Sequence, residues 1–232
     1  MSKPKPGPLP TSAPSAMRAV LSPSLGALRQ TVPITRHHAL FRVRVSGYAY
    51  EFDDGFVWQP DDADPQIFRW DEVATAHWYA SQHYVNGVYS GTQFWITLES
   101  SDRRKLKISG SCQDPSAKGV RKADPQAAGY LLYQFLSRVR DKVSEAQFPG
   151  AIAALNRGEQ LAFGDLKISS SGIQAPKGFV PWPSVRAVNV VKGRVSVSQE
   201  GKFFSLSAKG VEEIPNCPLF LNLAQALARQ AH

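Results

Sequence analysis

Seven basic side chains fall within about twenty residues near the middle of the chain, and they are the strongest candidates for a binding site. Two carboxylates, Asp102 and Asp114, oppose them. Such a concentration of positive charge suits a phosphate group or the acidic surface of a partner. A solvated hairpin tip followed by a mobile loop is the alternative, and both interpretations stay open. The candidate anion- or partner-binding residues are Arg103, Arg104, Lys105, Lys107, Lys118, Arg121 and Lys122.

The other residues that could do chemistry do not form a catalytic or metal-binding pattern. His77 and His83 lie six positions apart in a predicted strand, about 20 Å, which is too far for one metal ion. The acidic run at residues 61–64 lacks the glycine and the distal glutamate of a calcium loop. Motifs for a serine nucleophile, a zinc-binding helix and a phosphate-binding loop are absent from the sequence. The sequence therefore predicts no catalytic residue, no metal and no cofactor.

The two cysteines, Cys112 and Cys217, are too few for a disulfide framework or a metal cluster. We expect reduced thiols in a cytoplasmic protein, with a single disulfide as the alternative. No run of apolar residues is long enough to span a membrane, although attachment to a membrane surface stays open.

The net charge of +8 is concentrated in the first part of the chain. Residues 1–38 hold five basic residues and no acidic one, which leaves 22 basic against 19 acidic residues, or +3, for the remainder. A fold that binds nucleic acid usually carries its positive charge on the fold itself. The composition thus argues against a nucleic-acid partner. Residues 1–36 are also rich in proline, and we expect a disordered basic tail that makes few contacts with the fold.

Beyond the tail, hydrophobic alternation predicts strands and helical spacing predicts two helices. A helix is expected to begin at Asp124-Pro125 and to break at Pro149-Gly150, because proline and glycine interrupt helices. A short helical turn is expected to follow from Ala151 to Leu155. A second helix is expected from about residue 218 to residue 230. The predicted strands are 40–45, 48–52, 56–58, 70–83, 92–99, 104–109, 161–168, 186–191, 194–198 and 203–208, with turns at Asp53-Asp54-Gly55 and Asn86-Gly87.

One pattern occurs twice. Phe68, Trp70 and Val73 in the first copy correspond to Val180, Trp182 and Val185 in the second. Upstream of each copy lies a glycine followed by an apolar residue, at Gly55 and at Gly172. A longer apolar strand, a hairpin and a helix follow each copy. A recurring order of this kind indicates one supersecondary unit used twice.

The hairpins, the Trp-x-x-Val strand and the following helix resemble pleckstrin-homology-like (GRAM/PH-like) domains, in the tandem form of bacterial proteins of uncharacterised function. The resemblance rests on Gly55 to Val73, on Ala162 to Val185 and on the helix near Pro218. It implies an α+β fold of two units, each a strongly bent antiparallel sheet closed by a C-terminal helix. The expected boundaries are a tail at 1–36, a first domain at 37–157 and a second, smaller domain at 158–232.

The resemblance also implies binding of phosphoinositides, peptides or proteins rather than catalysis. Lipid-binding members carry basic residues in the loop between the first two strands, and this chain has Ser46-Gly47 or Asp53-Asp54-Gly55 there. We therefore expect a non-catalytic binding or scaffolding protein that recognises a protein partner. The alternatives are a module that binds anionic lipid at a membrane surface, or an enzyme of unrecognised type with its site between the units. The aromatic residues of the first unit, predicted as core or as an exposed docking patch, are Phe56, Trp58, Trp78, Tyr79, Phe94 and Trp95.

Overall fold

The computed structural model describes residues 24–38, 42–120, 124, 126–199 and 208–231. The first half of this part contains β1 (Leu28–His38), β2 (Arg42–Phe52), β3 (Gly55–Pro60), β4 (Gln66–Arg69), η1 (Trp70–Glu72), β5 (Val73–Val85), β6 (Val88–Ser100), β7 (Lys105–Cys112) and α2 (Ala128–Asn156). The second half contains β8 (Leu161–Phe163), β9 (Leu166–Ser169), β10 (Gly172–Ala175), β11 (Gly178–Pro181), η2 (Trp182–Ser184), β12 (Val185–Val191), β13 (Arg194–Gln199), β14 (Ala208–Gly210), η3 (Val211–Glu213) and α3 (Cys217–Gln230).

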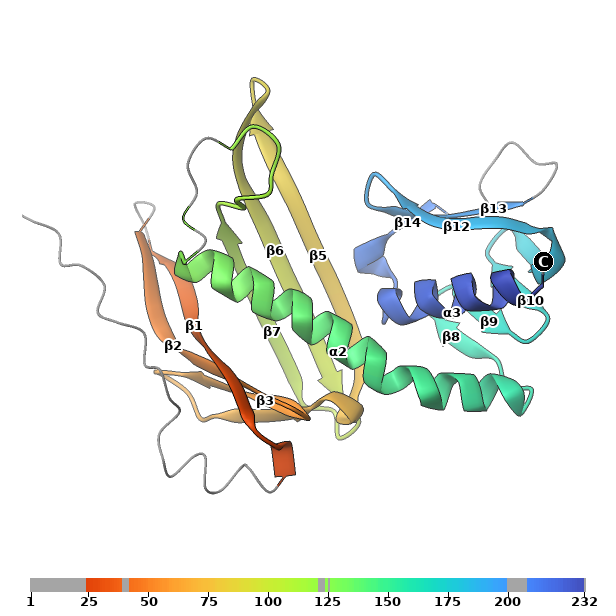
Figure 1. Ribbon diagram of the computed structural model, residues 1–232, viewed down its shortest axis with the longest axis horizontal. Coiled ribbons are helices and arrows are strands. Elements are labelled where there is room, and N and C mark those ends of the chain that lie inside the picture. The colour runs from red at the N-terminus through yellow and green to blue at the C-terminus, as the bar shows by residue number, and fades with distance from the viewer. Residues whose placement is uncertain (1–23, 39–41, 121–123, 125, 200–207, 232) are drawn as a thin grey trace, which may run out of the picture. The chain divides into compact units, whose positions relative to one another are not determined.

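Antiparallel sheets and two long helices make up the described part of the chain, which confirms the predicted α+β class (Figure 1). The strand orders are β1-β2-β3-β4, β5-β6-β7, β11-β10-β9-β8 and β12-β13-β14. Each order begins and ends with an edge strand, so these sheets are open. A four-stranded sheet, a short 3₁₀ turn, a three-stranded sheet and a helix thus follow one another twice.

The described residues pack into two compact units whose boundaries cut across this element order. Unit 1 comprises the described residues of Met1–Glu72, Ser81–Gln93 and Gly110–Leu136. Unit 2 comprises those of Val73–Ala80, Phe94–Ser109 and Ser137–His232. The predicted domains at 37–157 and 158–232 are a different division, which follows the repeat along the chain and stays a prediction.

The repeated Trp-x-x-Val sequence forms the same turn in both places, which we call the tryptophan turn (residues 53–73 and 169–185). In the first copy the indole Nε1 of Trp70 donates to the carbonyl of Asp53 over 2.8 Å. In the second, Nε1 of Trp182 donates to the carbonyl of Ser169 over 3.0 Å. Each tryptophan is buried and lies in a 3₁₀ turn rather than in the strand that was predicted. Because the ring nitrogen is satisfied within the turn, the rest of the indole can enter an apolar core.

A glycine in each copy permits the strands of the turn to approach closely. Gly55 pairs with Arg69 and Gly172 pairs with Pro181 in the antiparallel ladders. A Cβ added at Gly55 would lie 2.3 Å from the carbonyl oxygen of Phe68, and one at Gly172 would lie 2.2 Å from that of Val180. No side chain fits at such a distance, so both positions require glycine.

In unit 1, residues 24–38 pack against the fold, which differs from the predicted tail. Strand β1 pairs with β2 from Leu28 to His38. Leu25 is fully buried in a cluster with Tyr50, Phe52 and Val57. The composition of this segment alone predicts disorder, and the segment is ordered because β2 provides hydrogen-bond partners for its backbone. Residues 1–23, the larger part of the predicted tail, lie outside the described residues.

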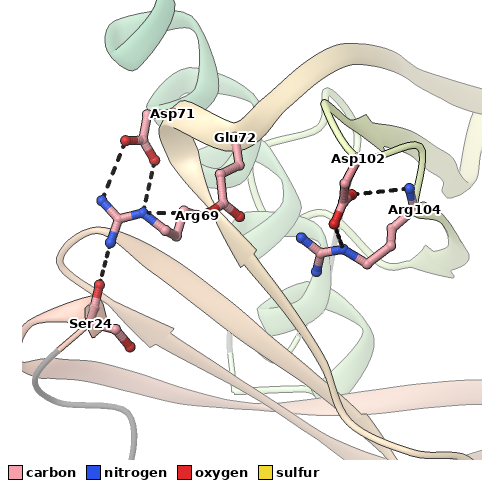
Figure 2. Close-up of polar contacts among 6 residues, drawn as sticks. All are labelled: Ser24, Arg69, Asp71, Glu72, Asp102 and Arg104. Atoms are coloured by element: carbon pink, nitrogen blue, oxygen red, sulfur yellow. Dashed lines mark hydrogen bonds and ion pairs between the residues drawn. The ribbon is translucent and has the colours of Figure 1, made fainter.

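Arg69 connects residue 24 to the first tryptophan turn (Figure 2). Its guanidinium donates to the carbonyl of Ser24 and, over 3.1 Å, to the carboxylate of Asp71. In the same turn, the ring of Phe56 stacks on the rings of Phe68 and Trp70, with centroid separations of 5.4 and 5.5 Å. The turn therefore links a surface ion pair to the core of unit 1.

In unit 2, the C-terminal helix α3 lies along the β12–β14 sheet (Figure 1). Its buried residues include Leu219, Phe220 and Leu223, which follow the predicted apolar stripe. They share one core with Phe163, Trp182 and the apolar residues of β12 and β13. Helical spacing in the sequence thus identifies the buried face of α3.

Two predictions in this region are wrong, namely the helix break at Pro149-Gly150 and the single strand at 161–168. Helix α2 continues through Pro149 to Asn156, because Ala151, Ala154 and Leu155 beyond the proline are buried. Tertiary packing of these residues outweighs the backbone hydrogen bond that proline removes. The predicted strand 161–168 is instead a tight hairpin, since Gly164 has a φ of 66° and reverses the chain between β8 and β9. The strand predicted at 203–208 lies mostly outside the described residues.

Candidate functional site

Unit 2 contains two neighbouring cavities between α2 and α3. One of about 410 Å³ is lined by Trp78, Arg140, Val211, Leu221 and Gln225 among others, and we call it the Trp78 cavity. The other, of about 430 Å³, is lined by Phe148, Pro149 and Arg229 among others. Asn222 lines both, and its amide donates to the hydroxyl of Ser144 on α2 over 3.4 Å. We call the two cavities together the α2–α3 groove.

A cation–aromatic pair forms one wall of the Trp78 cavity. The guanidinium of Arg140, on α2, lies over the indole of Trp78, on β5, at 5.4 Å from the ring centroid. The carboxylate of Asp141 accepts from Nε of Arg140 over 2.8 Å, which fixes the plane of the guanidinium. The indole is only partly buried. The wall therefore combines the aromatic surface of Trp78 with a positively charged guanidinium whose orientation is fixed by Asp141.

The edge of β5 is held next to the groove by one asparagine. Asn216 has a left-handed backbone, with a φ of 50°. Its side-chain oxygen accepts from the N–H of Ala76 over 2.7 Å, and its amide donates to the carbonyl of Ala74 over 2.8 Å. Its backbone N–H donates to the carbonyl of Ala76 over 2.8 Å. Asn216 thus bonds to an edge strand as another strand would, immediately before α3 begins.

The thiols are free and poorly suited to nucleophilic chemistry. Cys217 lines the Trp78 cavity, and Cys112 lies at the end of β7. Burial raises the pKa of each thiol to about 12. A nucleophilic cysteine needs the opposite shift, because the thiolate is the reactive form. Cys112 and Cys217 therefore do not form the disulfide that the sequence left open as an alternative.

Two of the four predicted basic residues at the β6–β7 hairpin are paired with local carboxylates. Arg104 forms an ion pair with Asp102 at 2.6 Å, drawn in Figure 2, and Lys105 forms one with Glu99 at 3.1 Å. Hydrogen bonds from the Ser100 hydroxyl and from Arg104 lower the pKa of Asp102 to about 2. Arg103, at a φ of 69°, and Lys107 are exposed. Four cations against two carboxylates leave this hairpin with a net charge of +2.

The remaining predicted basic residues follow β7. Lys118 is exposed and belongs to unit 1, whereas the hairpin residues belong to unit 2. Arg121 and Lys122 lie outside the described residues. The structure therefore brings four of the seven residues to one hairpin, and the anion-binding role of the set stays a prediction.

The predicted aromatic residues divide between core and surface. Phe56, Trp58 and Phe94 are buried. Tyr79 and Trp95, on neighbouring strands of unit 2, stack at 5.9 Å and are partly exposed. The core interpretation thus holds for Phe56, Trp58 and Phe94, and a docking role for the partly exposed residues stays a prediction.

The described histidines and acidic residues are not grouped as a metal site. Nδ1 of His77 lies 2.9 Å from the carbonyl of Glu212, and His83 is exposed. Within the described ranges, no three His, Cys, Asp or Glu side chains are grouped as metal ligands. The described helices also include none that is long and apolar enough to cross a membrane.

Sequence analysis missed Arg140, which lines the groove, and Asn216, which holds the edge of β5 next to it. Arg140 is one of several charged residues on the polar side of a predicted helix, and no local pattern marks its position over Trp78. Asn216 has the residue type of a helix cap, yet it makes no side-chain capping bond. The sequence feature that could have identified Asn216 is the tendency of asparagine, which it shares with glycine, to adopt a left-handed backbone conformation.

Comparison with known proteins gives a family match for the C-terminal part of the chain. Residues 134–232 match the model of a family of unknown function, DUF6585. The matched residues include Arg140, Asn216 and α3, and the match begins within α2. No curated protein matches the chain. In its C-terminal part the chain is thus similar to a family for which no activity is described.

Proposed function

We propose that this chain is a non-catalytic binding protein built from two pleckstrin-homology-like units, and that it recognises a protein partner through the α2–α3 groove. The observation that carries the proposal is the Arg140–Trp78 pair in the wall of a largely apolar cavity. Tryptophan and arginine are among the residues most enriched at the positions that dominate protein–protein binding energies.

The repeated architecture supports the domain part of the proposal. Each half of the described chain has a four-stranded sheet, a tryptophan turn, a three-stranded sheet and then a helix. Antiparallel strands followed by one helix is the element order that the resemblance to pleckstrin-homology-like domains implies. The hydrogen bonds of Trp70 and Trp182 occupy corresponding places in that order.

The size and lining of the groove suit the side chains of a partner protein. A cavity of about 410 Å³ admits a few apolar side chains. Burying one leucine- or phenylalanine-sized group there would contribute about 1.5–3 kcal/mol to binding. The polar rim at Asn222 and Gln225 offers amide groups that can pair with a partner's backbone, as the rim of a protein interface usually does.

The chemistry of the groove favours binding over catalysis. The thiol that lines it, Cys217, has a pKa raised to about 12 by burial. The arginine over Trp78 already pairs with Asp141. A general acid or base works best when its pKa lies near neutral pH, and the raised pKa of the Cys217 thiol lies far above that range.

Photo-crosslinking from the groove tests the proposal. Gln225 and Gln230 are both exposed residues of α3, but only Gln225 lines the Trp78 cavity. A photoreactive residue at 225 should crosslink a discrete protein in extract of the native cells, and one at 230 should not. Gln225→Arg should reduce capture of that protein at least tenfold, whereas Gln230→Arg should leave it unchanged. Equal crosslinking from both positions would contradict the assignment of the groove.

A further inference from the structure

The hairpin between β12 and β13 exposes two adjacent valines at its tip. Val190 is 45% exposed and Val191 is 56% exposed. Val191 pairs with Arg194 as the last step of the ladder. Lys192 and Gly193 form the two-residue turn, with φ values of 51° and 72°, as in a type I′ hairpin. The tip is therefore held by strand pairing up to its last residue, and the valines stay in solvent.

Two cations flank these valines. Lys192 and Arg194 are both exposed, and neither forms an ion pair with a carboxylate of the described residues. The acidic residues of the adjacent turn, Glu212 and Glu213, both approach Gly210 instead, and Glu213 accepts from its N–H over 3.0 Å. In contrast, Lys209 on β14 pairs with Asp165. The tip thus combines apolar surface with positive charge that no described carboxylate neutralises.

The corresponding hairpin of the first half is built in the same way. The turn between β5 and β6 is Asn86-Gly87, with φ values of 49° and 78°. Beside it, Tyr84, Val85 and Val88 are 45%, 62% and 64% exposed. The strand after each tryptophan turn therefore ends in an exposed apolar tip, once in each half of the chain.

We propose that the β12–β13 tip, Val190 to Arg194, inserts into the surface of an anionic lipid bilayer. A two-residue turn presents a narrow convex tip, and the interface of a bilayer can accept such a tip without a preformed pocket. The valines would enter the boundary between headgroups and acyl chains, while the two cations remain at the level of anionic headgroups. The complementary charge favours an anionic membrane over a neutral one.

The inference goes beyond the proposed function, because it assigns a membrane role to the hairpin tip rather than a protein partner to the groove. Val190 also lines the Trp78 cavity, whereas Val191 does not. Substitutions at Val191 therefore test the tip without changing the lining of the cavity.

Vesicle co-sedimentation with the full chain tests this inference. We expect binding to phosphatidylcholine vesicles that contain phosphatidylserine, and little binding to phosphatidylcholine alone. Val191→Asp should weaken binding about tenfold, because an apolar contact is replaced by a repelled charge. Val191→Trp should strengthen it, since tryptophan favours the membrane interface. An increase with one variant and a decrease with the other cannot both arise from damage to the fold.

Matched controls separate insertion from general electrostatics. Ile67→Asp places the same type of charge at an exposed apolar residue of β4, away from a hairpin tip. Lys192→Glu reverses a charge at the tip, and its control, Lys167→Glu, makes the same reversal at an exposed position of β9. Both controls should bind vesicles as the unaltered chain does, whereas Lys192→Glu should weaken binding at least fivefold.

Three results would overturn the inference. One is vesicle binding by Val191→Asp that equals that of Ile67→Asp. Another is an equal loss with Lys167→Glu and Lys192→Glu, which would show only net charge. The third is unchanged vesicle binding by Val191→Asp together with lost capture of a protein, which would assign the tip to that protein. Crosslinking from residue 225 is measured separately, so failure of either proposal is distinguishable from failure of the other.

Discussion

Asn216 combines a backbone conformation with a set of hydrogen bonds, and the two contributions can be separated by mutation. Asn216→Gly keeps the left-handed conformation accessible and removes the side-chain bonds to Ala74 and Ala76. We expect a loss of about 2 kcal/mol in the free energy of unfolding, at about 1 kcal/mol for each bond. Asn216→Ala removes the same bonds and adds a left-handed strain of about 1 kcal/mol.

Urea denaturation of the unaltered chain and the two variants checks this prediction. The unaltered chain should be the most stable, Asn216→Gly the next and Asn216→Ala the least, with the two variants about 1 kcal/mol apart. If glycine and alanine were equally destabilising, the left-handed conformation would not contribute. If glycine had no effect, the bonds to β5 would not stabilise unit 2.

At this scale the sequence identified residue types more successfully than it identified partners. It singled out Arg104 and Lys105 as candidate anion- or partner-binding residues, but it did not predict that each forms an ion pair within six residues, with Asp102 and with Glu99. It did not identify the pairing of Trp78 with Arg140, because contacts between residues so distant in sequence depend on packing rather than on local pattern. The exposed valines at 190 and 191 were missed for a related reason, since the sequence alone places them in an ordinary apolar strand.

Among the elements, the repeat that contains the tryptophan turn was the most predictable, although each tryptophan was expected in a strand and lies in a 3₁₀ turn. Its spacing in the sequence repeats, and the structure gives both copies the same indole hydrogen bond and the same glycine contact. Local geometry specifies such a turn, so a local pattern reveals it. The elements that were mispredicted, β1 and the end of α2, depend instead on partners elsewhere in the chain: β2 for the first, and a buried apolar cluster for the second.

The two glycines of the turn give a prediction with an internal control. Gly55→Ala and Gly172→Ala would each push a methyl group against a backbone carbonyl, and we expect each to cost about 3 kcal/mol of stability. At Gly150, on the exposed side of α2, an added Cβ meets nothing within 4 Å. Gly150→Ala should therefore stabilise the protein by about 0.5–1 kcal/mol.

Thermal unfolding of the three variants measures these effects. Melting temperatures should fall for the first two and rise for the third. A neutral Gly172→Ala would mean that β10 and β11 can separate at little cost, and the close approach would then not define the turn.

For the whole molecule, composition and periodicity predicted the fold class and the internal repeat, but not the division into compact units. The units take alternating pieces of β5, β6 and β7, so their boundaries follow packing rather than sequence order. No linker or change of composition marks such boundaries. The sequence can therefore identify the repeating elements without identifying which residues pack together into unit 1 and unit 2.

The division into units predicts that stability is not shared uniformly along the chain. Leu25→Ala removes a fully buried side chain from unit 1, at a cost of about 2–5 kcal/mol. We expect faster hydrogen exchange at the amides of β2 and β3 and unchanged exchange in α3, because local opening is confined to the packing unit it disrupts. Asn216→Ala should give the reverse pattern. Equal acceleration in both regions would show that the chain opens as one cooperative body.

The bond between Asn216 and the edge of β5 also bears on how the chain is made. The two residues that it joins are 140 positions apart, so a ribosome completes β5 well before it reaches Asn216. At about 5–20 residues per second, the edge strand waits roughly seven to thirty seconds for its partner. An open strand edge is a template for pairing with other chains. Nascent or prematurely terminated chains that lack Asn216 should therefore depend on chaperones to remain unaggregated, whereas the completed chain covers that part of the edge itself.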